Sequence, residues 1–162
     1  MSAAENIRKT IARFANSFDL KDCDLMETAL AWVLSVDYSD LRGDQPKEVT
    51  ARQYAQPRRE ALEALNIQHI IGDLEITTDG KRASVVASSM IFRDLDGEVF
   101  NTHARYRFGL SEDQDQGWVI DRINQTVPWN EGNPDIHSAS INHGLRAETL
   151  LENVIRFIYA AA

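Results

Sequence analysis

Cysteine, long apolar runs and an excess of positive charge are all scarce in this 162-residue chain. The single cysteine, Cys23, allows no disulfide within the chain and looks like a packing residue. No stretch approaches the roughly 18 apolar residues of a membrane-spanning helix. The first residues also lack the basic and apolar regions of a signal peptide. We therefore expect a soluble, cytoplasmic protein that binds no membrane.

Basic residues are outnumbered in this sequence. There are 25 acidic and 17 basic residues, which gives a formal net charge of −8 at pH 7. A surface for nucleic acid would need clustered lysine and arginine, so nucleic acid is not an expected partner. The length and the 43% share of hydrophobic residues suit one domain with a substantial core. We assign residues 1–162 to this single domain.

Motifs for several kinds of catalysis are missing as well. No two of the four histidines stand four residues apart, as on a zinc-binding helix, and there is no CxxC pair. The glycines are scattered and form no phosphate-binding loop, and there is no GxSxG nucleophile motif. We expect no metal and no cofactor. Acid–base chemistry by histidine and carboxylates is the class that remains.

Helical periodicity dominates the first 65 residues. The expected elements are helices at 7–18, 24–33 and 50–65, a short strand at 35–38 and a loop at 39–47. Pro57 is expected to break or restart the third helix. The charged run 58–60 has the composition of a solvated helix face.

After Asn66 the pattern changes from helical to alternating. The expected strands cover residues 67–78, 82–93, 99–110 and 118–129. Asp-Gly pairs at 79–80 and 96–97 are hairpin signals, so these strands form an antiparallel meander. An irregular stretch at 130–143 and a closing helix at 145–159 complete an α+β plan. A curved sheet folded around helices leaves a concave face, which is a natural pocket.

Strand parity sorts the side chains of the 99–110 strand. The even positions are mainly apolar and should face the concave side, which turns Tyr106 inward. Tyr106 is then either a core aromatic residue or a substrate contact. The odd positions, including His103, Arg105 and Arg107, should lie on the outer face, where they could take part in a subunit contact.

One ionisable ring stands among apolar residues on the first long strand. His69 is followed by Ile70 and Ile71, so it is either a core residue satisfied by a hydrogen bond or a poised acid–base group. Asp19 stands where the apolar face of the first helix ends, and Tyr38 should point inward beside Val36.

A carboxylate bonded to one ring nitrogen would orient the imidazole and raise its basicity. The other nitrogen could then take a proton from a substrate carbon, while a tyrosine hydroxyl stabilises an oxygen that gains charge. Asp19 could equally be an ordinary carboxylate at a helix end, so both interpretations stay open.

Three short segments resemble a known family. They are Phe18 to Asp24 (FDLKDCD), Val36 to Ser39 (VDYS) and Gln68 to Gly72 (QHIIG). They resemble the scytalone dehydratase and SnoaL-like branch of the nuclear-transport-factor-2-like superfamily, over about residues 5–135. The resemblance implies a cone-shaped barrel in which a strongly bent antiparallel sheet wraps the N-terminal helices and encloses a deep pocket. Residues 136–162 would be a C-terminal helical extension.

The resemblance also implies site residues. Asp19 would hold and polarise His69, His69 would be the general acid–base, and Tyr38 would orient a water or hydroxyl near the substrate carbonyl. Phe18, Arg93 and Tyr106 take the places of a tyrosine, a histidine and an asparagine of scytalone dehydratase, so scytalone itself is not the expected substrate. The expected substrate-binding residues are Tyr106, Phe18, Arg93, Ile123 and Trp129.

The family includes dehydratases, polyketide cyclases, ketosteroid isomerases and a dehydrochlorinase, all working without a cofactor, together with pocketed proteins of unknown activity. We therefore expect a dehydratase, elimination lyase or isomerase that acts on a small hydrophobic cyclic or aromatic carbonyl compound. The alternative is a protein that binds a small hydrophobic ligand in the same pocket without catalysis. The resemblance also implies a homo-oligomer, dimer or trimer, formed through the outer face of the sheet.

Overall fold

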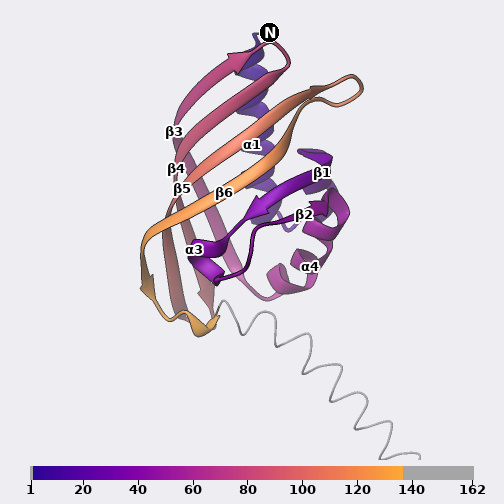
Figure 1. Ribbon diagram of the computed structural model, residues 1–162. Helices are drawn as coiled ribbons and strands as arrows, with labels where there is room; N and C mark the ends of the chain where they lie inside the picture. Colours follow the sequence, from indigo (N-terminus) through magenta and orange to yellow (C-terminus); the bar gives the residue numbers. More distant parts are fainter. Residues whose placement is uncertain (1, 137–162) are drawn as a thin grey trace, which may run out of the picture.

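A six-stranded sheet curls around helix α1 in the computed structural model, which describes residues 2–136 (Figure 1). The strand order is β2-β1-β6-β5-β4-β3. The expected α+β architecture with a strongly bent sheet is confirmed. The predicted closing helix at 145–159, and with it His137 and His143, lies outside the described residues.

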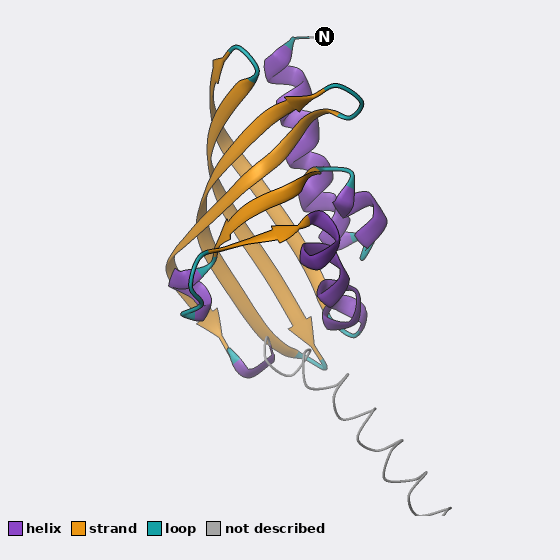
Figure 2. Cartoon of the chain, turned by 45° about the vertical axis from the view of Figure 1, so that its right-hand side comes forward, coloured by secondary structure: helices purple, strands orange, loops and turns teal. Residues whose placement is uncertain are grey.

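Helix α1 spans Ala3–Asp19 and begins at a capping box, in which Ser2 and Glu5 each bond the other's backbone N–H. The helix lies along the concave side of the sheet (Figure 2). Its apolar stripe, which includes Ile7 and Phe14, is buried. The helix ends at Asp19, and Lys21 then takes a left-handed conformation with φ of 55°.

The second predicted helix is much shorter than expected. Helix α2 covers only Cys23–Glu27, and strand β1 begins at Leu30 and runs to Asp37. The apolar run from Ala29 to Val36 suits either period, and pairing with β6 decides in favour of a strand. The expected loop at 39–47 contains the short helix α3, Ser39–Arg42, and is followed by strand β2, Lys47–Thr50.

Helix α4, Ala51–Glu63, is continuous through Pro57, where the sequence predicted a break. It starts at a second capping box, formed by Thr50 and Gln53. Buried residues lie on both sides of the proline, Tyr54 before it and Leu62 after it. Tertiary packing on both halves therefore outweighs the local cost of Pro57.

The four long strands agree with the predicted meander and extend slightly beyond it. They are β3 Asn66–Asp79, β4 Arg82–Leu95, β5 Glu98–Asp113 and β6 Gly117–Gly132. Residues 130–132, predicted to be irregular, belong to β6. The sheet is not wholly antiparallel, because β1 pairs with β6 in parallel and carries β2 on its other side.

A bulge in β3 reverses the inward face of that strand. The pairing with β4 shifts by one residue between Gly72 and Glu75, and Asp73 takes a φ of 51°. His69 and Ile71 point to the core before the bulge, whereas the even-numbered Leu74 does so after it. Simple alternation cannot predict this change.

The main core lies between α1 and the concave face of the sheet. Phe14 of α1 packs its ring 5.8 Å from that of Phe108, and both side chains are buried. The even positions of β5 are buried as parity predicted, Tyr106 among them. None of the helices that the structure describes has the length and apolarity needed to cross a membrane.

Candidate functional site

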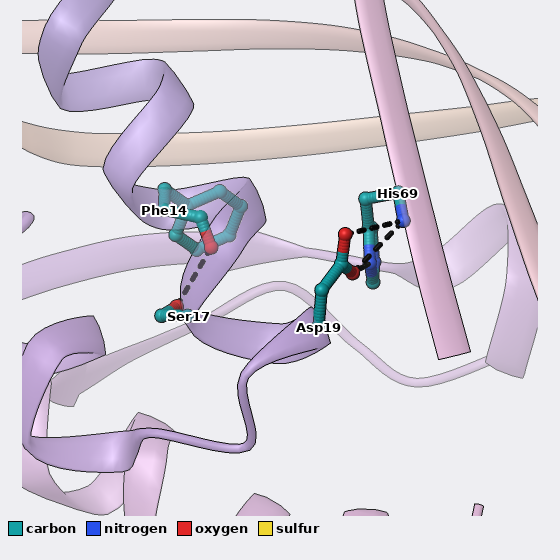
Figure 3. A network of polar contacts seen from close by, with 4 residues as sticks. All are labelled: Phe14, Ser17, Asp19 and His69. Atoms are coloured by element: carbon teal, nitrogen blue, oxygen red, sulfur yellow. Dashed lines mark hydrogen bonds and ion pairs between the residues drawn. The ribbon is translucent and has the colours of Figure 1, made fainter. Parts of the chain in front are cut away.

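Asp19 and His69 meet at the open edge of the sheet (Figure 3). Strand β3 is an edge strand, so alternate backbone N–H groups point away from the sheet. The N–H of His69 donates to Asp19 Oδ1 at 2.9 Å and to Oδ2 at 3.1 Å, and the ring atom Nδ1 lies 2.9 Å from Oδ1. These three contacts fix both the carboxylate and the plane of the imidazole.

The position of Asp19 is unfavourable for a carboxylate considered alone. It occupies the last residue of α1, where the helix dipole presents its negative end. The two donors of His69 offset this repulsion. Local helix preferences therefore do not explain why an acidic residue stands at this position. The contact of Asp19 with His69 does explain it.

The hydrogen bond from Asp19 determines which ring nitrogen of His69 can act as a base. Nδ1 carries the proton that the carboxylate accepts, which leaves Nε2 as the acceptor atom. No residue of the described range 2–136 hydrogen-bonds Nε2. Burial lowers the pKa of His69 below its ordinary value of 6.5, Asp19 raises it in part, and the charge of Arg93 lowers it. The ring is therefore a neutral base near pH 7.

Phe18 and Arg93 lie beside this pair. The ring centroid of Phe18 is 4.7 Å from that of His69. Arg93 is a buried inward residue of β4 whose Nη1 donates to Thr102 Oγ1 at 2.8 Å. Burial lowers the pKa of the Arg93 guanidinium to about 10, so it remains a cation at neutral pH. Three of the sequence-predicted residues are thus close to one another.

Tyr106 faces the same interior. Its hydroxyl accepts a hydrogen bond of 2.7 Å from Gln125 Nε2, and burial raises its pKa well above the ordinary value. The positive charge of Arg93 opposes this rise in pKa, so the guanidinium and the phenol lie close enough to interact electrostatically. Gln125 Oε1 and the hydroxyl of Ser89 are buried and have no hydrogen-bond partner within residues 2–136. Such atoms are normally satisfied by water or by a ligand.

Tyr38 belongs to a second group, not to the contact between Asp19 and His69. Its hydroxyl lies 2.6 Å from that of Tyr54, and the two rings stack at 6.5 Å. The guanidinium of Arg58 lies 3.6 Å from the centre of the Tyr54 ring and 5.8 Å from that of Phe18. Arg58 thus connects the tyrosine pair to the ring that packs on His69, and it does not belong to a solvated helix face as the sequence suggested.

A pocket of about 190 Å³ opens next to the tyrosine pair. It lies between β1, β2, α3 and α4, and Tyr38, Tyr54 and Arg58 are among the residues that line it. His69 and Asp19 are not part of its lining. Arg58, which lines the pocket, also lies over the Phe18 ring that packs on His69.

Comparison with known proteins settles the family. A family model described as a SnoaL-like domain matches residues 1–124. The chain belongs to this family. The resemblance to the SnoaL-like branch that the sequence suggested is therefore confirmed. A comparison with curated proteins finds no match.

Solved structures share the fold of this SnoaL-like domain. The Kfla4162 protein of Kribbella flavida is 23% identical, with a TM-score of 0.76, covering 82% of this chain and 94% of its own. A candidate scytalone dehydratase from Novosphingobium aromaticivorans is 12% identical, with a TM-score of 0.66 and coverages of 78% and 85%. A hexachlorocyclohexane dehydrochlorinase, LinA type 2, is 9% identical, with a TM-score of 0.66 and coverages of 78% and 86%. At these identities the likeness establishes the fold alone.

Two further residues expected to bind substrate in the SnoaL-like domain lie on opposite faces of β6. Ile123 is fully buried in the main hydrophobic core. Trp129 is 54% exposed and stacks on His103 of the outer face, with ring centroids 4.1 Å apart, so it lies on the side opposite to the concave face. The cause is a one-residue register shift in β6 opposite His103 and Arg105, which turns Trp129 to the other side.

Several functional candidates of the SnoaL-like domain were missed in the sequence. Tyr54 and Arg58 lie on helix α4, where the charged run suggested a face exposed to solvent. Ser89 and Gln125 are polar residues at inward positions of predicted strands. Parity along 82–93 and 118–129 was the signal that could have found the latter pair. Within residues 2–136, no three His, Cys, Asp or Glu side chains lie together as a metal site.

The contact between Asp19 and His69 should be visible in the titration of His69. An NMR pH titration should give a pKa below 6.5 in the wild type and a lower one in Asp19→Asn, because the variant loses the interactions that raise it. Asp96→Asn, in the β4–β5 turn, removes one carboxylate elsewhere and should leave the His69 pKa unchanged. An unchanged or increased pKa in Asp19→Asn would contradict a coupled pair.

Proposed function

We propose that this protein is a cofactor-independent acid–base enzyme, a dehydratase, elimination lyase or isomerase, that acts on a small hydrophobic cyclic or aromatic carbonyl compound. The observation that carries the proposal is the orientation of His69. Its Nδ1 is held by Asp19 at 2.9 Å, its side chain is 5% exposed, and its Nε2 has no partner within residues 2–136. A buried, neutral and oriented imidazole with one vacant acceptor is the arrangement that proton abstraction needs.

The proposed step begins at a carbon next to the substrate carbonyl. Nε2 of His69 removes a proton from this carbon, and the electron pair moves toward the carbonyl oxygen, which gains negative charge. Tyr106 keeps its proton and can donate a hydrogen bond to this oxygen, because the phenol oxygen already accepts from Gln125. In a dehydration the neighbouring C–O bond then breaks as the double bond forms. The protonated His69 returns its proton to the departing hydroxide, so that water leaves and the imidazole is neutral again.

Asp19 supports this step as a positioning residue. Its carboxylate stabilises the imidazolium that forms when Nε2 accepts the proton. We assign Tyr38 to the adjoining pocket, where it pairs with Tyr54. Its phenol stays protonated near pH 7, because burial raises its pKa well above the ordinary value. It can therefore donate to a substrate oxygen or an ordered water, the role the sequence predicted for it.

The proposal is tested by incubating the purified protein with a panel of small cyclic β-hydroxy and β-halo ketones. Formation of the conjugated double bond is followed by its ultraviolet absorbance. Conversion by the wild type that disappears in His69→Gln would support the proposal. Full turnover in both His69→Gln and Asp19→Asn would show that another group does the chemistry.

A second candidate function, ligand binding without catalysis, is favoured by one specific contact. Asp19 also accepts the backbone N–H of His69, so it fastens the end of α1 to the edge of the sheet. That contact has a structural use even if no proton is transferred. Native mass spectrometry distinguishes the two functions: a copurifying compound released unchanged favours binding, and its rapid conversion favours the enzyme.

We also propose that the protein forms a homo-oligomer through the outer face of the sheet. Ile70, Met90, His103 and Trp129 pair in sequence across four strands and form one row on this face. Ile70, Met90 and Trp129 are 51%, 38% and 54% exposed. A row of exposed apolar side chains is what a second copy of the chain would cover.

The oligomer is tested by light scattering coupled to size-exclusion chromatography. The wild type should have two or three times the chain mass of 18.3 kDa, and Met90→Asp should shift toward 18.3 kDa. Leu20→Asp is the control, since Leu20 is 68% exposed at the end of α1. A monomeric wild type, or a Met90→Asp variant of unchanged mass, would exclude this interface.

A further inference from the structure

We propose that the substrate carries a carboxylate and that Arg93 binds it. The inference rests on the proposed function, because it names the class of compound that the same site accepts. It makes the substrate a small cyclic or aromatic keto or hydroxy acid. The carboxylate would fix the ring so that its reactive carbon faces Nε2 of His69.

The position of Arg93 suits this role. In the β3–β4 ladder His69 lies opposite Ile91, and Arg93 lies two residues further along β4 on the same concave face. Diagonal neighbours of this kind are about 7–8 Å apart. The charge of Arg93 also acts on the His69 ring. A carboxylic acid bound at Arg93 therefore brings a carbon close to the base.

Arg93 is a buried cation without a counter-charge in the described part of the chain. It is 5% exposed, and no carboxylate of residues 2–136 lies within ion-pair distance of it. Its polar contacts are Thr102 Oγ1 at 2.8 Å and the carbonyl of Phe100 at 3.5 Å, and both are made by Nη1. The guanidinium also faces the Phe100 ring at 5.5 Å.

An unpaired buried guanidinium is costly, and its fork of donors fits a carboxylate. The chain has 25 acidic residues and a net charge of −8, yet residues 2–136 place none of those acids against Arg93. Nε and Nη2 make no hydrogen bond with the described residues, so within residues 2–136 nothing competes with a ligand for a bidentate pair. A carboxylate on the ligand would satisfy both.

The same surface leaves further polar atoms for a ligand. Ser89 and Gln125 are 4% and 2% exposed, and neither Ser89 Oγ nor Gln125 Oε1 has a partner within residues 2–136. Arg58, the second cation near Tyr106, likewise makes no ion pair with the described residues. The part of the concave face around Arg93, Tyr106 and Gln125 is thus polar and cationic within an acidic protein. Such a region favours an anionic ligand over a neutral one.

The test compares two aromatic probes of the same shape, benzoate and benzamide, by calorimetry with the purified protein at about pH 8, where His69 is neutral. Benzoate should bind at least about tenfold more tightly than benzamide. Arg93→Met should abolish this preference, and Arg93→Lys should restore part of it. Arg107→Met is the matched control, because Arg107 is exposed on the outer face of β5, and it should retain the full preference.

The outcomes separate this inference from the proposed function. Equal affinity for the two probes, or a benzoate preference that survives in Arg93→Met, would overturn the carboxylate site and leave the acid–base function standing. Binding of benzoate through Arg93 without turnover of any ketone or keto acid would overturn the enzyme and leave the site. If Arg93→Met does not fold, the Arg93 Nε resonance of the wild type must respond to benzoate and not to benzamide.

Discussion

Replacing His69 by glutamine is expected to lower kcat/KM by about 10²–10⁴-fold on any substrate that the wild type dehydrates or eliminates. Glutamine keeps a polar side chain of similar reach, but it cannot take up a proton. The vacant acceptor of His69 is the only base that the described residues hold in this orientation, with Asp19 at 2.9 Å behind it. The loss should therefore appear in kcat, since the binding groups are untouched.

Two controls make this result specific. Gln68→Ala changes the preceding, exposed residue of β3 and should retain the wild-type rate. The acid limb of the wild-type kcat/KM profile should report a pKa below 6.5, and it should move to lower pH in Asp19→Asn. A variant at His69 that retains its turnover, with an unchanged circular dichroism spectrum, would rule out this residue as the base.

Replacing Phe14 by alanine is expected to lower the free energy of unfolding by about 3–5 kcal/mol. Phe14 is buried, and its ring contacts Phe18 at 5.3 Å, Phe108 at 5.8 Å and Tyr54 at 6.2 Å. Removing it opens a cavity that three rings border. For a domain of this size the loss corresponds to a decrease in Tm of roughly 6–20 °C.

The Phe14→Ala experiment also tests the connection between core and site. Phe18, which packs on His69, would lose its edge-to-face partner, so the His69 NMR signals should shift as well. Leu20→Ala removes a side chain that is 68% exposed, and should change stability by less than about 0.5 kcal/mol. A Phe14→Ala variant as stable as Leu20→Ala would mean that the core closes around the gap without cost.

Much of the fold was predictable because it depends on local patterns. Alternation and Asp-Gly turns located the four long strands to within a few residues, and parity placed Tyr106 on the buried face. Local patterns failed where a segment suits two periods, as at 30–33, where the end of an expected helix belongs to strand β1. They failed again at Pro57, because packing on both sides of it maintains α4.

At the site, residue types and strand parity identified groups that could do chemistry. They pointed to His69, Asp19, Tyr38 and Tyr106 as ionisable or hydroxyl-bearing groups at inward or terminal positions, and the resemblance added Arg93. Their types, and the resemblance to the SnoaL-like branch, were enough to suggest an acid–base pair.

Which of these groups come into contact is set by the folded chain. The bend of the sheet brings the end of α1 to the free edge of β3, across 50 residues of sequence, where Asp19 finds two donors of His69. The register shift in β6 turns Trp129 away from the concave face. Arg93 is buried, and it has no carboxylate partner among the described residues. Edge pairing, bulges and desolvation depend on contacts between distant segments, so no local pattern of the sequence contains them.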